Sequence, residues 1–125
     1  MWEHAFVTSQ GSLRHQFQRA LERGSALDAI SAAKAMGGLS LGDALALCVV
    51  LAERDPAKYP RAVTRWIGRF LEETPDATLE EVQLLTTALA TLARMPGLAR
   101  PMLREFASHR GLSTVSGVFA DFVEV

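Results

Sequence analysis

The feature that most constrains this chain is an unbroken apolar stretch that runs from Ala44 to Ala52 with the sequence ALALCVVLA. Ser40 precedes it in the manner of a helix N-cap, Asp43 follows the cap three residues later, and Asp55-Pro56 ends it. A helix that is apolar on every side has to be covered on every side. The sequence therefore predicts a compact helical domain that wraps around one central helix.

Helical periodicity and capping signals divide the rest of the chain into further helices. We expect helices over residues 12–23, 25–36, 78–94 and 98–109. Another helix precedes Pro75, and either a short turn at 56–59 leads into it or Pro60 lies within its first turns. Residues 1–11 are expected to be an irregular arm, and residues 112–125 an amphipathic tail that could add a seventh helix. The fold class is all-α, with six or seven helices in a single domain over residues 1–125.

Two segments of the chain match each other at an offset of 38 residues. Ser40 aligns with Thr78, Leu47 with Leu85, and Leu51 with Leu89. Each segment then meets a proline and enters a second helix with a central aromatic residue, which predicts stacked antiparallel hairpins of the α-solenoid kind. Residues 12–36 would form a shorter third hairpin. Chance matching of leucine-rich helices explains the alignment equally well, so both interpretations stay open.

Composition and charge exclude several classes of protein. The formal net charge of −1 gives the chain as a whole no electrostatic attraction for nucleic acid or anionic membrane. The one cysteine, Cys48, excludes an internal disulfide. No apolar stretch is long enough to span a bilayer, and the first residues lack the basic and apolar regions of a signal peptide. We therefore expect a cytoplasmic protein with no membrane association.

No residue pattern in the chain predicts catalysis, a cofactor or a metal site. Residues 38–42 match the G-x-S-x-G pattern of a hydrolase nucleophile elbow, but that motif requires a strand before the serine, and a helix precedes Ser40. His4, His15 and His109 lack the close ligand spacing of zinc sites. Cys48 lies in apolar surroundings, where a thiol is inert. We predict that the protein is not an enzyme and binds no cofactor.

Arginines recur at helical spacing on two of the predicted helices. On one helix they are spaced three and four residues apart and form a single stripe, and on a later helix two more lie four apart. If the hairpins stack in register, these residues merge into one basic face that could bind an acidic protein surface or a nucleic-acid backbone. An ordinary solvated helix face is the alternative. The residues are Lys58, Arg61, Arg65, Arg69, Arg100 and Arg104.

The C-terminal tail is the second candidate surface. Val118, Phe119 and Phe122 recur at helical spacing, and Asp121 and Glu124 make the segment acidic. Its apolar face has to be covered, either by the chain's own hairpins or by exchange between the subunits of a homodimer. These three residues are therefore candidate partner-binding residues.

Together these patterns predict a non-enzymatic helical module for protein–protein interaction, an adaptor whose partner is another protein of unknown identity. The first alternative is nucleic-acid binding through a basic face of Arg61, Arg65, Arg69, Arg100 and Arg104, which we consider the weaker interpretation. The second alternative is a helical protein that binds a small ligand in a pocket near Tyr59, Trp66 and Cys48.

Overall fold

The computed structural model describes the backbone of residues 2–112 and the side chains of residues 11–112. The described residues contain helices and turns but no strand, which confirms the all-α fold class. The elements are α1 (Trp2–Arg23), α2 (Ala26–Met36), α3 (Leu41–Arg54), the short 3-10 turn η1 (Pro56–Lys58), α4 (Tyr59–Glu73), α5 (Leu79–Leu92) and α6 (Pro96–His109).

Three helices begin at the capping residues that the sequence indicates. The side-chain hydroxyls of Ser25, Ser40 and Thr78 each accept a hydrogen bond from the backbone N–H three residues later, at 3.1–3.4 Å. Gly37 ends α2 in the left-handed conformation, with φ at 84°. The turn η1 leads directly into α4, so the first of the two predicted arrangements around Pro60 is the one found.

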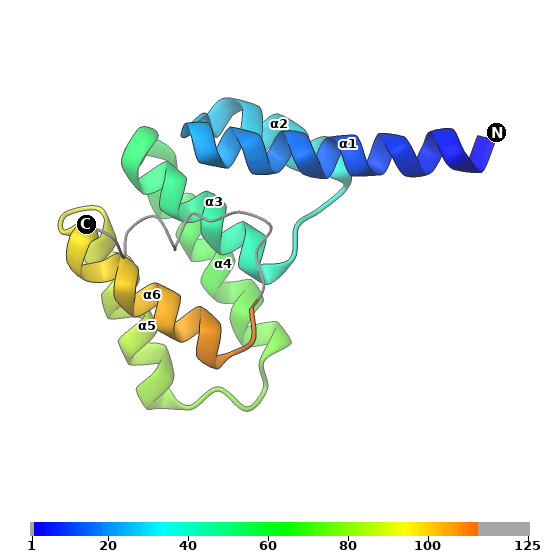
Figure 1. The fold of residues 1–125 in the computed structure, drawn as a ribbon. Coiled ribbons are helices and arrows are strands. Elements are labelled where there is room, and N and C mark those ends of the chain that lie inside the picture. The colour runs from blue at the N-terminus through cyan, green and yellow to red at the C-terminus, as the bar shows by residue number, and fades with distance from the viewer. Residues whose placement is uncertain (1, 113–125) are drawn as a thin grey trace.

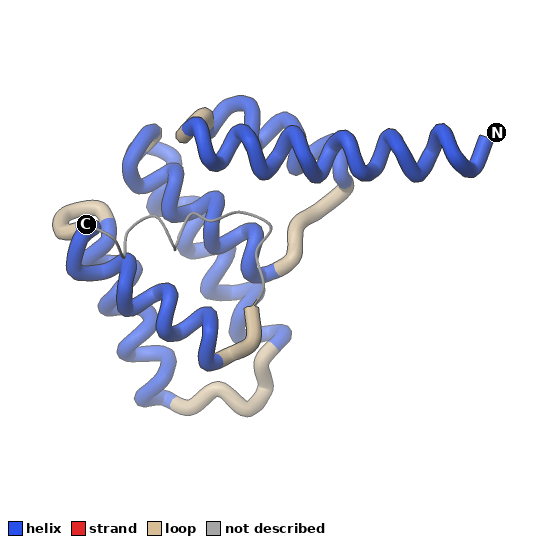
Figure 2. Tube along the Cα trace, in the orientation of Figure 1, coloured by secondary structure: helices blue, strands red, loops and turns tan. Residues whose placement is uncertain are grey.

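The helices pair as three consecutive hairpins, α1 with α2, α3 with α4, and α5 with α6 (Figures 1 and 2). Two buried hydrogen bonds hold α4 in place, one to α3 within its own hairpin and one to α5 of the third hairpin. The Trp66 indole N–H donates to the backbone carbonyl of Leu41 at 2.9 Å, and the Tyr59 hydroxyl donates to the carbonyl of Leu89 at 2.7 Å. Helix α4 therefore holds both α3 and α5, which fixes the position of its remaining, solvent-facing side.

An aromatic cluster joins the second helices of the last two hairpins. The Trp66 and Phe70 rings stack with their centroids 5.5 Å apart, and Phe106 of α6 meets Phe70 edge-on at 5.4 Å. Phe70 is fully buried and Trp66 nearly so. The central aromatic residues of the two hairpins thus share one core, as expected for stacked hairpins.

The central-helix prediction is largely confirmed, with one exception on α3. The predicted core side chains that are buried are Cys48, Leu51, Trp66, Phe70, Leu85 and Leu89. Leu47 was predicted to be buried with them but is only partly buried. The reason is that Leu47 faces a groove between α3 and its neighbours, so α3 is not covered on every side.

The N-terminal prediction is wrong. Residues 1–11 were expected to be irregular, but α1 begins at Trp2 and extends well beyond α2 (Figure 1). Gly11 does not interrupt α1, because a single glycine costs a helix only about 1 kcal/mol. The predicted tail helix, with Val118, Phe119 and Phe122, lies outside the described residues.

Candidate functional site

The candidate site is an open groove of about 750 Å³ that runs along α3 between α2 and α4. Helix α3 forms its floor, α2 forms one wall, and η1 with α4 forms the other. We call it the basic groove, because five cationic side chains surround an otherwise apolar surface. Its cations are Lys34, Lys58, Arg61, Arg65 and Arg69, and its other lining residues are Ile30, Ala44, Leu47, Cys48, Leu51, Ala57, Ala62 and Trp66.

The amphipathic sequence of α4 sets the cationic wall in place. Tyr59, Trp66 and Phe70 turn inward to the core, which leaves the side of α4 that carries the arginines facing the groove. Arg61 and Arg65 lie four residues apart, so they are neighbours on the helix surface. The stripe predicted from the sequence is therefore a wall of a groove, a feature that the spacing of one helix alone could not reveal.

The cations of the basic groove differ in how they are neutralised. Lys58 pairs with Asp55 at 3.2 Å, and Arg69 pairs with Glu73 at 2.6 Å. Within the part of the chain that the structure describes, no carboxylate lies within ion-pair distance of Lys34, Arg61 or Arg65. All three side chains are exposed. The groove therefore presents uncompensated positive charge from both of its walls.

The floor of the groove contributes exposed apolar surface between these charges. Ala44 and Leu47 of the floor are partly buried, and Ile30 of α2 and Ala62 of α4 continue this partly buried apolar surface onto the two walls. Ala44 and Leu47 lie three residues apart and form a half-buried strip along α3, and Leu51, one turn further on, lines the groove with only 3% of its surface exposed. The floor and the walls together combine an apolar strip with flanking positive charge, which is the chemistry of a site for an amphipathic acidic partner.

Two of the predicted basic residues do not line the basic groove. Arg100 was predicted to share an exposed face with the arginines of α4, but its side chain is only 8% exposed and pairs with Glu53 of α3 at 2.5 Å. Arg104 is partly buried and is absent from the groove lining. The prediction was wrong for Arg100 because a carboxylate on the neighbouring hairpin holds it, a contact that periodicity within one helix cannot show.

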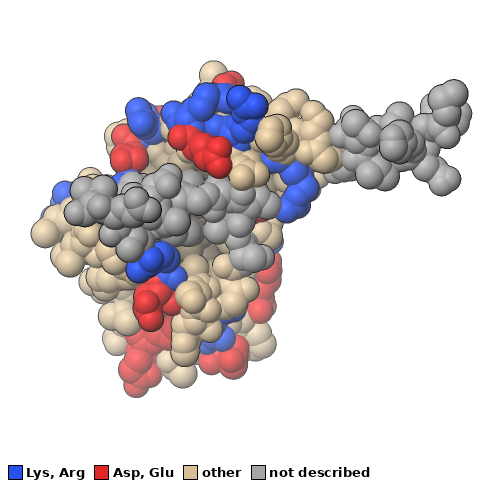
Figure 3. Space-filling model, viewed as in Figure 1, with Lys and Arg blue, Asp and Glu red and all other residues tan. Residues whose placement is uncertain are grey.

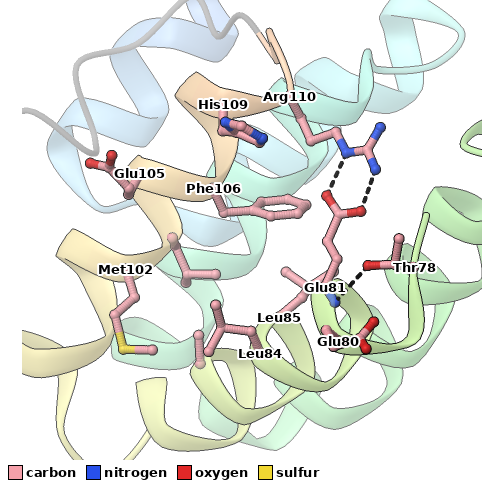
Figure 4. Close-up of a pocket in the computed structure, with 12 residues that line it drawn as sticks. Thr78, Glu80, Glu81, Leu84, Leu85, Met102, Glu105, Phe106, His109 and Arg110 are labelled. Atoms are coloured by element: carbon pink, nitrogen blue, oxygen red, sulfur yellow. Dashed lines mark hydrogen bonds and ion pairs between the residues drawn. The ribbon is translucent and has the colours of Figure 1, made fainter. Parts of the chain in front are cut away.

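A second groove, of about 590 Å³, lies between α5 and α6 (Figure 4). Leu84, Met102 and Phe106 line its apolar part. Arg110 closes one end, where its guanidinium makes two hydrogen bonds to the Glu81 carboxylate (Figure 4). The same guanidinium makes a further pair of hydrogen bonds to Asp76 at 3.1 Å. The hydrogen bonds from Arg110 hold the pKa of Glu81 below its ordinary value. In this groove the arginine is already neutralised by the chain itself.

The arrangement of Arg110 was not predicted from the sequence. Asp76 and Glu81 lie 34 and 29 residues before it, so no local pattern connects the three side chains. The Arg110 guanidinium also lies 6.0 Å from the centre of the Phe70 ring. Acidic and basic side chains are likewise intermixed on the face seen in Figure 3, with acidic atoms prominent toward the end where α5 lies.

Ser40 and Cys48, whose residue types can act as nucleophiles, serve the fold in this structure. The Ser40 hydroxyl accepts the N–H of Asp43 as an N-cap, and no strand precedes it among the described residues. Burial raises the pKa of the Cys48 thiol to about 12, so the thiol stays protonated at neutral pH. Burial, and secondarily Cys48, also raises the pKa of Tyr59. Cys48 and Trp66 line the basic groove, whereas the Tyr59 hydroxyl donates to the backbone carbonyl of Leu89 in α5 and Tyr59 is not among the lining residues.

Within the described residues, no three or more His, Cys, Asp or Glu side chains gather where they could hold a metal ion. None of the described helices combines the length and the apolar character needed to cross a membrane. Comparison with protein-family models, with curated proteins and with solved structures gives no match to this chain. The site is therefore interpreted from its own geometry.

Proposed function

We propose that this protein is a non-enzymatic protein–protein interaction module, an adaptor that holds an acidic segment of a partner protein in the basic groove. One observation carries the proposal: three exposed cations without a carboxylate partner among the described residues flank an apolar strip on the central helix. We place its action in the cytoplasm, where a free thiol such as that of Cys48 stays reduced.

Electrostatics favours an acidic partner over a neutral one. Uncompensated cations next to an apolar surface steer an acidic surface into contact and repel basic competitors. Burial of the apolar strip then adds non-directional stabilisation that a purely ionic contact lacks. The expected complex is sensitive to salt in its association rate and to apolar truncation in its dissociation rate.

Photo-crosslinking with the full chain tests this function. A photoreactive residue replaces Ala57, which is exposed at the groove edge, and the crosslinked products from the native cell are identified by mass spectrometry. We expect crosslinks to an acidic segment of a protein, and we expect the double variant Arg61→Glu/Arg65→Glu to abolish them. The matched control is Arg14→Glu/Arg94→Glu, which makes the same charge change at exposed positions outside the groove and should leave the crosslinks intact. Crosslinks that persist in the groove variant would overturn the proposal.

A second candidate function is nucleic-acid binding, which the row of cations along η1 and α4 favours. Lys58, Arg61, Arg65 and Arg69 span twelve residues, about 16 Å of helix, enough to contact several phosphates. Fluorescence anisotropy with mixed-sequence DNA and RNA at about 50 mM NaCl separates the two functions. Binding that falls steeply with salt and disappears in the Arg61→Glu/Arg65→Glu variant would support nucleic acid, and absence of binding removes this class.

A further inference from the structure

The apolar strip of α3, at Ala44 and Leu47, is the part of the central helix that residues 11–112 leave partly uncovered. Leu45, Val49 and Val50 on the other sides of α3 are buried, whereas Leu47 and Ala44 are only partly so. A helix with apolar residues all round is stable only when every side is covered. The uncovered strip therefore marks a place for one more element, between α2 and α4.

The dimensions of the groove suit a helix of about three turns. Its cationic wall extends over the twelve residues from Lys58 to Arg69, which corresponds to about 16 Å of helix. Side chains spaced three and four apart on an added helix would meet Ala44 and Leu47, the half-buried side chains of the floor, which lie three residues apart on α3. Helix-on-helix packing therefore fits both the length of the groove and the spacing of its floor.

The backbone groups of the groove make an extended peptide a poorer fit than a helix. The floor and walls are formed by α2, α3 and α4, whose interior backbone N–H and C=O groups are paired within each helix. An extended peptide obtains its affinity from the free backbone groups of a sheet edge, which these helices do not offer. A helical occupant satisfies its own backbone groups and needs only side-chain contacts.

The charges specify the polar side of that occupant. Arg61 and Arg65 are one helical turn apart on the α4 wall, and Lys34 stands on the α2 wall. Acidic side chains spaced four apart on an added helix would match the two arginines, and one more acid on its other flank would match Lys34. A nucleic-acid backbone would meet the same cations but would leave the apolar strip in contact with phosphates and water, which it does not favour.

From these observations we infer that the partner segment is an acidic amphipathic α-helix of about three turns, which lies between α2 and α4 with its apolar side on α3 and acids on both flanks. This inference rests on the proposed function and specifies the structure of the partner segment.

Three synthetic peptides of about 16 residues test the inference against the full chain. The first has leucines three and four apart with glutamates on both flanks. The second has the same composition shuffled so that the leucines surround the helix, and the third replaces the glutamates of the first by glutamine. Binding is measured by fluorescence anisotropy at about 50 mM and about 300 mM NaCl, and peptide helicity by circular dichroism.

We expect the first peptide to bind at least about tenfold more tightly than either of the others, to become helical on binding, and to bind less tightly at high salt. The variant Arg61→Glu/Arg65→Glu should weaken its binding by about tenfold or more, and Leu47→Asp should do the same by charging the floor. The control Arg14→Glu/Arg94→Glu should not change it. Circular dichroism of each variant verifies that it is folded.

Each outcome separates the inference from the function on which it rests. Equal binding of the first and second peptides would overturn the helical partner and leave an acidic protein segment in the groove. Equal binding of the first and third would overturn the role of the cations. Failure of all three peptides, while the Ala57 crosslinks to a protein still depend on Arg61 and Arg65, would overturn the helical partner alone. Loss of those crosslinks as well would overturn the proposed function.

Discussion

The hairpins α3–α4 and α5–α6 begin alike and differ in how they use their arginines. Ser40 and Thr78 cap the first helices in the same way, and these two helices begin 38 residues apart with 14 residues each. In α4 the exposed Arg61 and Arg65 face an open groove without an ion-pair partner among the described residues. In α6, by contrast, Arg100 is held by a carboxylate from the chain itself.

The difference shows which charges contribute to the fold and which remain available to a partner. Arg110, just after α6, forms ion pairs with Glu81 and Asp76. The positive charge at the end of the groove between α5 and α6 is therefore neutralised by carboxylates of the chain itself. A neutralised arginine offers little attraction to an acidic partner, since its charge is already balanced at short range. The α3–α4 hairpin retains its positive charge, and this contrast is the basis for proposing that a partner binds to that hairpin.

The largest expected effect tests whether the α3–α4 and α5–α6 hairpins contribute equally to the stability of the core. Leu51 of α3 and Leu89 of α5 occupy matching positions, and their exposed fractions are 3% and 2%. Truncation of either to alanine leaves a cavity, so Leu51→Ala and Leu89→Ala should each lower the free energy of unfolding by about 2–5 kcal/mol. Urea denaturation followed by circular dichroism measures both. A loss below about 1 kcal/mol at either position would show that the hairpins are not equivalent cores.

The sequence predicted the helices and most of this core because both depend on local signals. Caps at Ser25, Ser40 and Thr78, together with apolar periodicity, locate the helices from α2 onward without knowledge of their neighbours. The ion pair of Arg100 with Glu53 depends instead on how separate hairpins meet. Helix periodicity places a residue on one face but does not tell which element lies opposite. For that reason the sequence identified some of the residues that line the basic groove. It could not show that Arg100 lies outside the groove.

The apolar residue Leu47 shows the same limit, because periodicity does not tell whether any element covers it. An apolar helix predicts burial for all its residues, so the partial exposure of Leu47 could not be expected from composition. Departures from the sequence rule are expected at functional sites, where a surface is reserved for another molecule. The mistaken prediction at Leu47 therefore points to the same groove as the unpaired arginines do.

The next prediction compares matching residues that differ in burial. Leu85 of α5 is 2% exposed, whereas its counterpart Leu47 is only partly buried in the basic groove. We expect Leu85→Ala to cost about 2–5 kcal/mol in unfolding free energy and Leu47→Ala to cost clearly less, because less contact is lost and no closed cavity forms. The same urea titrations measure both. An equal cost would mean that the basic groove is closed in solution, which would contradict a docking site there.

A smaller effect is expected at the two helix caps, which should remain equivalent. Ser40→Ala and Thr78→Ala each remove one hydrogen bond to a backbone N–H in the first turn, so each should cost about 1 kcal/mol. Ser40→Asp and Thr78→Asp keep an acceptor and should restore most of the stability. If Ser40→Ala cost nothing, the hydroxyl would not be needed as a cap, and labelling of Ser40 by a fluorophosphonate probe would then decide whether it is a nucleophile.

The smallest expected effect is a change in melting temperature, and it compares Arg110 with Arg65. Arg110→Gln should lower the melting temperature at neutral pH, because Glu81 and Asp76 lose the guanidinium that neutralises them. Arg65→Gln is the matched control and should leave the melting temperature unchanged, since no described carboxylate pairs with Arg65. If Arg65→Gln lowered the melting temperature more than Arg110→Gln, then Arg65 would be the arginine that stabilises the fold, and the contrast between the two would be reversed.

Acid titration identifies the source of that difference. The Arg110 hydrogen bonds hold the pKa of Glu81 below its ordinary value. A carboxyl with a depressed pKa in the folded state contributes stability that is fully present above its ordinary pKa and disappears as the pH falls through the folded pKa. The gap in melting temperature between the unmodified protein and Arg110→Gln should therefore be constant near neutral pH and should narrow once the pH falls below about 4. A gap that persists at about pH 2.5 would show that Arg110 stabilises the hairpin through its contact with Phe70 and not through the ionised Glu81.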